Sequence, residues 1–284
     1  MTVPTYTTAL ELARDPARFD LDTQPTRWVP PTPFESVDLR PGRVALIGSP
    51  PGAGKTTLAL QLVFDVAAQH GLRAVIANVE MSPDTLTDKI LARLARVDVT
   101  ALLNRDLTGP ERDRILSAVA THADALGRIA FHIGPPTVAS VYESARSFDA
   151  RLIVLDYLQR LALDAADDRV RLDRLMSQVR RVADQGLAVL VISSVSRQRT
   201  RNGSTYDNLA LASYRGSAEL EFASDSAYIL DANLPHGIAT LRQVKNRYGP
   251  LRDIPLRFDG PYQEFRAGDA LDGYDAAAGA GGKG

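Results

Sequence analysis

The chain of 284 residues contains no cysteine, which excludes disulfides, thiolate nucleophiles and Cys-ligated zinc or iron–sulfur sites. Neither sign of charge is in excess, because 33 Lys and Arg stand against 34 Asp and Glu. This balance excludes a protein coated in positive charge, so any contact with nucleic acid must be local. The sequence also lacks the run of about 18 apolar residues that a membrane span needs and the apolar core of a signal peptide. We therefore expect a cytoplasmic protein without membrane contact.

What is present is enough for one globular domain, since 45% of residues are apolar and 24% are charged. Seven of the 17 prolines fall within the first 41 residues, which predicts an extended N-terminal arm over residues 1–42 with a short helix near residues 8–14. We expect Trp28 to pack this arm onto the body, or the arm to dock on a neighbouring subunit. Six of the 20 glycines lie in residues 267–284, and we predict a flexible Gly/Ala-rich tail over residues 261–284. The domain itself is expected over residues 43–260.

Within that domain, short apolar runs alternate with helical segments, the pattern of an α/β fold whose mostly parallel central sheet is flanked by helices. Helix starts are indicated by Ser82, Thr108 and Thr137, and helix ends by Gly71 and Gly186. Antiparallel strands are expected to be added near the end of the domain. The expected parallel strands are residues 43–48, 74–79, 128–133, 151–155 and 187–193, and the expected antiparallel additions are residues 226–230, 238–245 and 254–258.

A glycine-rich loop follows the first expected strand and precedes a helical run. Such a loop turns backbone N–H groups around phosphate oxygens, and the following helix directs its positive N-terminus at the same anion. The lysine of the loop is expected to reach the β- and γ-phosphates of ATP, and the threonine after it to bind Mg²⁺. The first position of the usual pattern is serine instead of glycine. The predicted nucleotide contacts are Ser49, Gly52, Ala53, Gly54, Lys55, Thr56 and Thr57.

Two acidic residues follow apolar strands and complete the predicted ATP site. Asp156 directly follows the expected strand 151–155 and is predicted to share the Mg²⁺ shell with Thr56, although an Asp here can also cap the next segment. Glu80 follows the second strand, where parallel strands deliver side chains to the carboxyl edge of the sheet. We predict Glu80 as the general base that activates water; the alternative is a solvated residue ahead of the helix that Ser82 caps.

Several further segments match one family in the correct order. They are Asn78-Val-Glu-Met-Ser82, Leu152-Ile-Val-Leu-Asp-Tyr-Leu-Gln159, Val191-Ile-Ser-Ser-Val-Ser-Arg197, Tyr214-Arg-Gly-Ser-Ala-Glu-Leu-Glu221 with Asp225, and Lys245-Asn-Arg-Tyr-Gly249. Over residues 40–260 the chain resembles the motor domain of DnaB-type replicative helicases, within the RecA-like P-loop ATPases. The resemblance implies a RecA-like fold, Glu80 as the catalytic carboxylate and Asp156 as the acid of the metal shell.

The same resemblance implies that Lys245 and Arg247 act in trans, on the γ-phosphate of ATP bound to a neighbouring subunit. Cations that arrive only in the assembled state can neutralise the charge on the transferring phosphoryl group. The other interpretation is a strand edge that faces solvent. A homo-oligomer, expected as a hexameric ring, would then be required for activity.

Contacts with single-stranded DNA are expected at two places. The resemblance assigns Arg215, Gly216 and Ala218 to a loop that lines the channel of the ring and contacts the DNA backbone. Arg197, Arg199 and Arg201 follow a core strand on a glycine-containing loop, where they could track phosphates without reading sequence. The alternative for these three arginines is a solvated loop.

Two departures from the family pattern stand out. Ser194 occupies the position where the family has a glutamine that senses the γ-phosphate, so the coupling between hydrolysis and loop movement is in question. Only 42 residues precede the first strand, too few for the helical domain by which full-length replicative helicases bind primase. Primase binding is therefore not predicted, and a plasmid, phage or accessory helicase, or a motor completed by another chain, fits better.

The sequence thus predicts an ATP-dependent, ring-forming helicase that moves on single-stranded DNA, with ATP and Mg²⁺ as cofactors. The resemblance implies that it moves 5′-to-3′. One alternative is a RecA- or RadA-like repair or recombination ATPase that binds DNA without unwinding it. Another is a regulatory protein whose nucleotide state controls its interactions with other proteins. Stimulation of ATP hydrolysis by single-stranded DNA would separate the motor from the regulatory protein.

Overall fold

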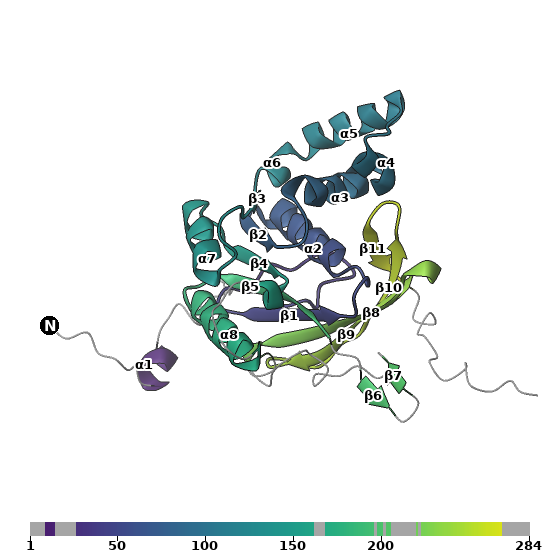
Figure 1. The fold of residues 1–284 in the computed structure, drawn as a ribbon. Helices are drawn as coiled ribbons and strands as arrows, with labels where there is room; N and C mark the ends of the chain where they lie inside the picture. The colour runs from purple at the N-terminus through teal and green to yellow at the C-terminus, as the bar shows by residue number, and fades with distance from the viewer. Residues whose placement is uncertain are drawn as a thin grey trace, which may run out of the picture.

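The computed structural model describes residues 9–14, 27–161, 168–195, 198–200, 203–205, 220 and 223–268. Its centre is a nine-stranded sheet with the order β11-β10-β9-β8-β1-β5-β4-β2-β3 (Figure 1). The six strands β8, β1, β5, β4, β2 and β3 run parallel, and β9, β10 and β11 continue the sheet antiparallel. The predicted fold class is confirmed. The strands are β1 (Val44–Ser49), β2 (Ala74–Asn78), β3 (Ile129–Phe131), β4 (Leu152–Asp156), β5 (Ala188–Ser194), β8 (Ser226–Asn233), β9 (Ile238–Asn246), β10 (Ile254–Asp259) and β11 (Glu264–Ala267).

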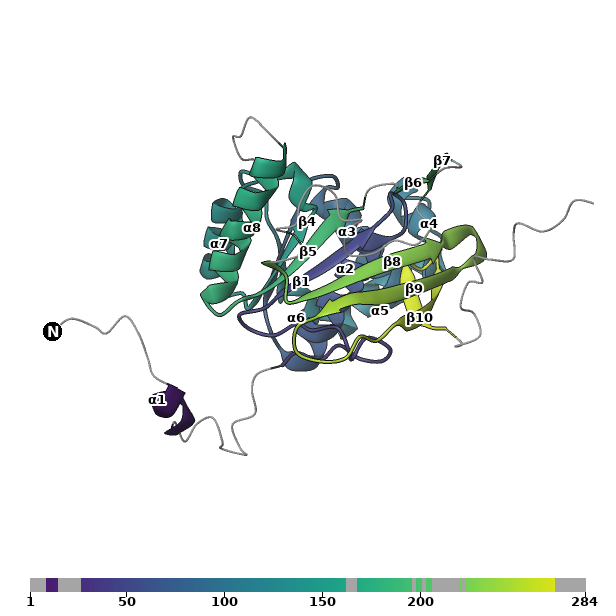
Figure 2. The same ribbon diagram turned by 90° about the horizontal axis from the view of Figure 1, so that it is seen from below.

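Helices cover both faces of the parallel part of the sheet (Figures 1 and 2). One face carries α2 with α3 and α6 stacked outside it, and the other carries α7 and α8. Ser82, Thr108 and Thr137 each cap the start of a helix, as predicted. Among the described helices, none combines the length and the apolar character needed to cross a bilayer. The helices are α1 (Ala9–Arg14), α2 (Lys55–His70), α3 (Pro83–Ala95), α4 (Val99–Asn104), α5 (Gly109–Thr121), α6 (Ala123–Leu126), α7 (Val138–Ser147) and α8 (Asp168–Asp184), with the short 3-10 turns η2 (Leu158–Arg160) and η4 (Leu234–His236).

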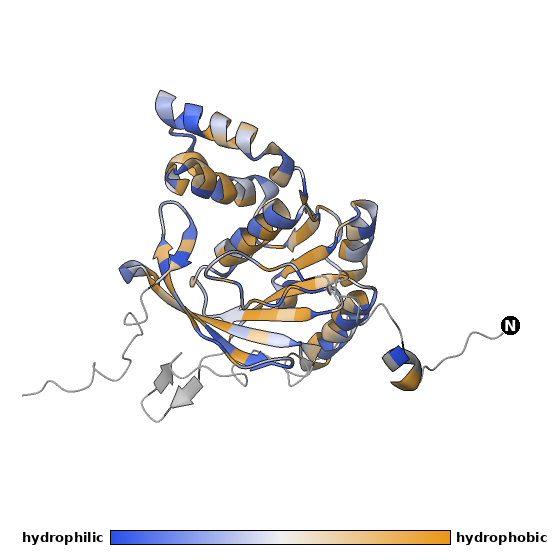
Figure 3. Ribbon diagram, turned by 180° about the vertical axis from the view of Figure 1, so that it is seen from behind, coloured by the Kyte–Doolittle hydropathy of each residue, from blue (hydrophilic) through white to orange (hydrophobic). Residues whose placement is uncertain are grey.

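The core consists of two apolar layers separated by the sheet, because alternate residues of a strand face opposite sides. In β1, Ala45 and Ile47 pack in the layer under α2, and Val44 and Leu46 pack in the layer under α8. All four are buried. Figure 3 shows orange, hydrophobic stretches along the strands that lie between the helices. A strand buried on both faces fixes the position of its last residue, which matters because the glycine-rich loop follows β1 directly.

The segment before β1 joins this core. Trp28, Phe34, Val37 and Leu39 are buried in the layer under α2, so Trp28 packs this segment onto the body, as predicted. The hydroxyl of buried Tyr228 donates to the carbonyl of Ser36 at 3.0 Å and accepts from the backbone N–H of Asp38 at 3.1 Å. Residues 27–41 are therefore tied to β8.

At the other end, the sheet continues past residue 260, where the sequence indicated a flexible tail. Residues 261–263 turn, and β11 pairs with β10, with Phe265 opposite Phe258. Phe265 is 1% exposed, and Gln61 of α2 binds both its backbone N–H and its carbonyl at 2.8 Å. The Gln61 amide makes the two hydrogen bonds that a neighbouring strand would make, and the Phe265 ring is buried. These two contacts explain why so short a segment joins the domain. Residues 269–284 lie outside the described part.

Candidate nucleotide-binding site

The glycine-rich loop connects β1 to α2 and has the backbone shape that phosphate binding requires. Gly52 and Gly54 have φ values of +79° and +88°, which lie in the left-handed region that residues other than glycine rarely adopt. Gly54 is the N-cap of α2 and makes no side-chain capping bond, so the N–H groups of the first turn are available to an anion. A Cβ on Gly54 would also lie 2.9 Å from the ring of Phe265.

Lys55 begins α2, and its side chain folds back over the loop. Its Nζ donates to the carbonyl oxygens of Ser49 and Pro50 at 3.4 and 3.3 Å. Burial lowers the pKa of Lys55, and the carboxylates of Asp156 and Glu80 oppose this. These long bonds to neutral oxygens are weak enough to be exchanged for phosphate oxygens.

The two predicted metal-shell residues lie in contact. Thr56 Oγ1 donates to Asp156 Oδ2 at 2.7 Å. Burial raises the pKa of Asp156, whereas hydrogen bonds from Thr56 and Asn78 lower it. A hydroxyl and a carboxylate are oxygen ligands, and Mg²⁺ usually takes one or two protein oxygens together with phosphate and water. The residues present therefore fit a nucleotide-bound Mg²⁺ ion.

Asn78 links this pair to Glu80 and was quoted in the sequence motif without a role. It ends β2 directly opposite Asp156 in β4. Its Nδ2 donates to Asp156 Oδ2 at 2.6 Å, and its Oδ1 accepts the backbone N–H groups of Glu80 and Met81 at 2.8 and 2.7 Å. One amide thus orients the metal-shell carboxylate and shapes the turn that carries Glu80. The sequence feature that could have indicated this role is the position of Asn78, a polar residue, at the end of an apolar strand.

Glu80 lines a cleft of about 410 Å³ together with Lys55, Thr56 and Asp156. Its side chain is 43% exposed and lies 3.9 Å from the guanidinium of Arg160. The predicted general base is therefore beside the predicted phosphate and metal ligands, with an accessible carboxylate.

Ser194 lines the same cleft at the end of β5. The residue before it, Ser193, is buried and accepts a hydrogen bond from Gln159 Nε2 at 2.6 Å. The structure thus places the short hydroxyl side chain of Ser194 in the cleft.

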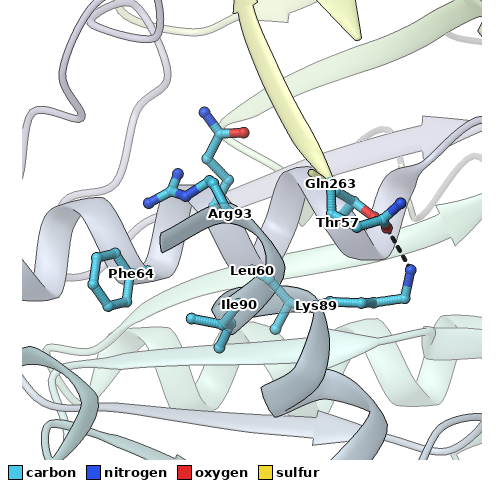
Figure 4. A pocket seen from close by; sticks show the side chains of 8 residues that line it. Thr57, Leu60, Phe64, Lys89, Ile90, Arg93 and Gln263 are labelled. Carbon is cyan, nitrogen blue, oxygen red and sulfur yellow. Dashed lines mark hydrogen bonds between the residues drawn. The ribbon is translucent and has the colours of Figure 1, made fainter. Parts of the chain in front are cut away.

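The cleft has a second side that the sequence did not indicate, formed by α3 and the turn before β11. Gln263 Oε1 accepts hydrogen bonds from Lys89 Nζ at 2.6 Å and from Thr57 Oγ1 at 2.9 Å. Figure 4 shows Lys89 reaching from α3 toward Gln263 and the start of α2. Leu234 and Phe258 add apolar lining to the cleft. Gln263 was missed because it lies in the segment interpreted as a tail.

Lys245 and Arg247 lie beside the amino ends of β1 and β8, whereas the cleft lies at the carboxyl ends of the parallel strands. The backbone N–H of Arg247 donates to the carbonyl of Asp225 at 2.9 Å, and that of Asp225 to the carbonyl of Val44 at 2.8 Å. Val44 begins β1 and the phosphate loop follows its end, a separation of about 17 Å along the strand. Within the chain, the Arg247 guanidinium pairs with Asp225 at 3.2 Å, and Lys245 Nζ donates to the carbonyl of Ser224 at 2.7 Å.

Most of the predicted DNA contacts, namely Arg197, Arg201, Arg215, Gly216 and Ala218, lie outside the described residues. Arg199 belongs to β6 (Gln198–Thr200), which pairs antiparallel with β7 (Gly203–Thr205) apart from the main sheet (Figure 1). At this point the expected loop therefore contains two short paired strands.

Comparison with known proteins agrees with this geometry. The family model of the DnaB-like helicase C-terminal domain matches residues 36–267. Replicative DNA helicase DnaB of Leifsonia xyli subsp. xyli is 25% identical over 256 residues, which are 83% of this chain and 55% of that protein. A probable plasmid replicative DNA helicase of Chlamydia trachomatis is 23% identical over 251 residues, 84% of this chain and 54% of that protein. The chain therefore spans about half the length of these curated relatives.

Solved structures show the same fold. One of them, described as an ATPase domain, superposes with a TM-score of 0.79 at 17% identity, covering 93% of this chain and 100% of that one. A DnaB-like replicative helicase, described with its interactions with primase, gives a TM-score of 0.76 at 17% identity and covers 93% of this chain and 67% of that one. With a family match over most of its length and the RecA-like ATPase fold, this chain belongs to the DnaB-like helicase C-terminal domain family.

Proposed function

We propose that this protein is an ATP-dependent DNA helicase motor that acts in replication as a ring of identical subunits and moves on single-stranded DNA. The observation that carries the proposal is the single cleft in which Lys55, Thr56, Asp156 and Glu80 converge. They come from the start of one helix and from the ends of two strands, and each has the chemistry that phosphoryl transfer to water requires.

The geometry supports the following proposed roles. The N–H groups of the loop and the ammonium of Lys55 bind the phosphates. Thr56 and Asp156 would hold Mg²⁺, which when bound neutralises charge on the β- and γ-phosphates. Glu80, exposed beside them, accepts the proton of the attacking water. Asn78 holds the Asp156 carboxylate and the backbone of Glu80 in fixed positions relative to each other, because its amide binds both.

The position of Lys245 and Arg247 favours action on a neighbouring subunit. An arginine side chain reaches about 7 Å, less than half of the distance of about 17 Å that separates the edge of β1 near Arg247 from the loop of the same chain. We propose that assembly brings these two cations to the γ-phosphate held by the next subunit, in a hexameric ring. ATP would then be cleaved efficiently only in the assembled state.

Single-stranded DNA is the proposed track, contacted by the arginines of the β6–β7 segment (Arg197, Arg199 and Arg201) and by Arg215, Gly216 and Ala218. The proposed polarity is 5′-to-3′ and the proposed location is the cytoplasm, both from the family. Primase binding is not part of the proposal.

The test is ATP hydrolysis measured with and without single-stranded DNA at low salt, combined with strand displacement on a forked duplex. We expect DNA to accelerate hydrolysis and unwinding to require ATP. Hydrolysis that ignores DNA would contradict the motor and favour a regulatory nucleotide switch. Accelerated hydrolysis without strand displacement would favour a repair or recombination ATPase.

A further inference from the structure

Lys89 stands out because its charge is partly buried and no described residue places an opposite charge beside it. Among the described residues its Nζ donates to the neutral amide oxygen of Gln263, and burial lowers the pKa of Lys89 with no carboxylate opposing. A cation removed from water without a counter-ion destabilises the fold. Retaining one in such a place suggests that a ligand supplies the missing negative charge.

The position of Lys89 identifies the ligand. It lines the same cleft as Lys55, Thr56 and Asp156, and its ammonium shares the Gln263 oxygen with the hydroxyl of Thr57 (Figure 4). In a phosphate loop the lysine serves the β- and γ-phosphates and the first threonine serves Mg²⁺, whereas backbone N–H groups serve the α- and β-phosphates. Thr57 lies one residue past those two side chains. Lys89 therefore approaches the loop from the side of the nucleoside.

We propose that Lys89 is a second phosphate-binding lysine of this site, which pairs with the α-phosphate of the bound nucleotide. This inference rests on the proposed function, because it needs a nucleotide in the cleft. On binding, the ammonium exchanges or shares its bond to Gln263 for a phosphate oxygen. Gln263 also accepts a hydrogen bond from the hydroxyl of Thr57, so it keeps a partner at the start of α2 when Lys89 on α3 turns to the phosphate.

Arg93 provides a matched control on the same helix. It lies one turn beyond Lys89 and borders the small pocket in Figure 4, but its guanidinium donates to Asp65, with Nη1 and Oδ2 at 3.0 Å. The described residues that line the nucleotide cleft do not include it. Its charge is already balanced within the chain, so its removal should disturb folding and leave the nucleotide unaffected.

The experiment measures ADP binding by calorimetry in the presence of Mg²⁺, and thermal unfolding with and without ADP, for the full chain and for Lys89→Met, Lys89→Arg and Arg93→Met. A lost charge-assisted bond should weaken ADP binding about 10-fold in Lys89→Met. The unfolding midpoint without ADP should stay equal or rise, while the upward shift that ADP causes shrinks. Lys89→Arg should restore most of the affinity, and Arg93→Met should show the reverse pattern, with a lower midpoint and unchanged affinity.

Binding of a slowly hydrolysed ATP analogue tests whether Lys89 contacts the γ-phosphate instead. Lys89→Met should weaken the analogue and ADP by the same factor, because both carry the α-phosphate. A loss confined to the analogue would overturn the α-phosphate assignment. Wild-type affinity and an unchanged thermal shift in Lys89→Met would overturn the whole inference while leaving the proposed function intact. A full chain that binds no ADP would overturn both.

Discussion

The two edges of the parallel sheet use charge in opposite ways. At the carboxyl edge, Lys55 and Lys89 donate to neutral oxygens among the described residues, and Glu80 is 3.9 Å from an exposed arginine. At the amino edge, Asp225 is 2% exposed at its side chain and pairs with Arg180 at 2.7 Å and with Arg247 at 3.2 Å. The first edge is arranged to receive charge from a ligand. At the second edge, a buried carboxylate and two arginines pair within the chain.

The difference between the two edges shows that nucleotide binding and folding stability depend on different parts of this fold. Substitutions at the carboxyl edge should change nucleotide handling with little effect on unfolding, whereas substitutions at the amino edge should lower stability. Arg247 is an exception under the proposed function. It pairs with Asp225 at the amino edge of its own subunit but is expected to act on ATP bound at the carboxyl edge of a neighbouring subunit. Tyr248 beside it stacks under the guanidinium of Arg43, 3.2 Å from the ring centroid, and so packs within the chain.

The largest expected effect is that of Arg247→Ala. Loss of a cation that acts on the transferring phosphoryl group should lower DNA-stimulated turnover about 10³- to 10⁵-fold. Mixtures with Lys55→Ala subunits should recover part of the activity, because some interfaces then combine an intact loop with an intact finger. Steady-state hydrolysis across mixing ratios measures this. Absence of recovery at every ratio would contradict action in trans.

Glu80→Gln should come next. The amide keeps the size of the side chain but cannot accept the proton of water, so turnover should fall about 10²- to 10⁴-fold. ADP affinity and the unfolding midpoint should remain near those of the full chain, because the Glu80 side chain is 43% exposed and its carboxylate faces Arg160. Single-turnover hydrolysis and calorimetry separate the two properties. Normal turnover would remove Glu80 from its proposed role.

Asp225→Asn tests the amino edge. A neutral amide would leave Arg180 and Arg247 without their shared counter-charge, and we expect a loss of about 3 kcal/mol in the free energy of unfolding, at the low end for a buried pair because Arg247 is half exposed. Urea denaturation measures it. Asp231→Asn is the control, since that carboxylate is 57% exposed at 3.9 Å from Arg242 and should contribute less than about 1 kcal/mol. Equal losses in both variants would contradict the distinction between the edges.

The smallest effect is expected for Asn78→Ala, which removes the amide between Asp156 and the turn that carries Glu80. Partners that orient metal ligands typically change activity about 10- to 100-fold, and the loss should appear in kcat and in the Mg²⁺ concentration needed for half activity more than in ADP affinity. Asn78→Asp keeps the acceptor but places a second carboxylate beside Asp156, so it should be no better. Full activity in both variants would show that Asn78 only completes a turn.

Local patterns predicted the parts of the molecule that depend on neighbours in sequence. The apolar runs indicated every strand from β1 to β5 and from β8 to β10 within one to three residues, with β3 shortest relative to its prediction. The phosphate loop and Asp156 were recognisable because glycine spacing and a strand end are local features, and the structure brings both into one cleft with Glu80.

The remaining features depend on contacts across long stretches of chain. β11 is held by Gln61, 204 residues earlier, and nothing in the four residues Glu264–Ala267 announces that contact. Asn78 acquires its role from the register that sets it opposite Asp156. Lys89 on its helix looks like any solvated lysine until the turn with Gln263 covers it. Register and coverage are tertiary properties, and sequence periodicity does not encode them.

The order of strands in the sheet bears on how this protein is made. β1 is the first strand of the sheet to be synthesised, yet its neighbours β5 and β8 begin only at Ala188 and Ser226. Pairing segments so distant in the chain requires closing a long loop, which slows folding. A chain still on the ribosome therefore has no finished phosphate loop until most of the domain has emerged, and incomplete chains should not capture cellular nucleotides.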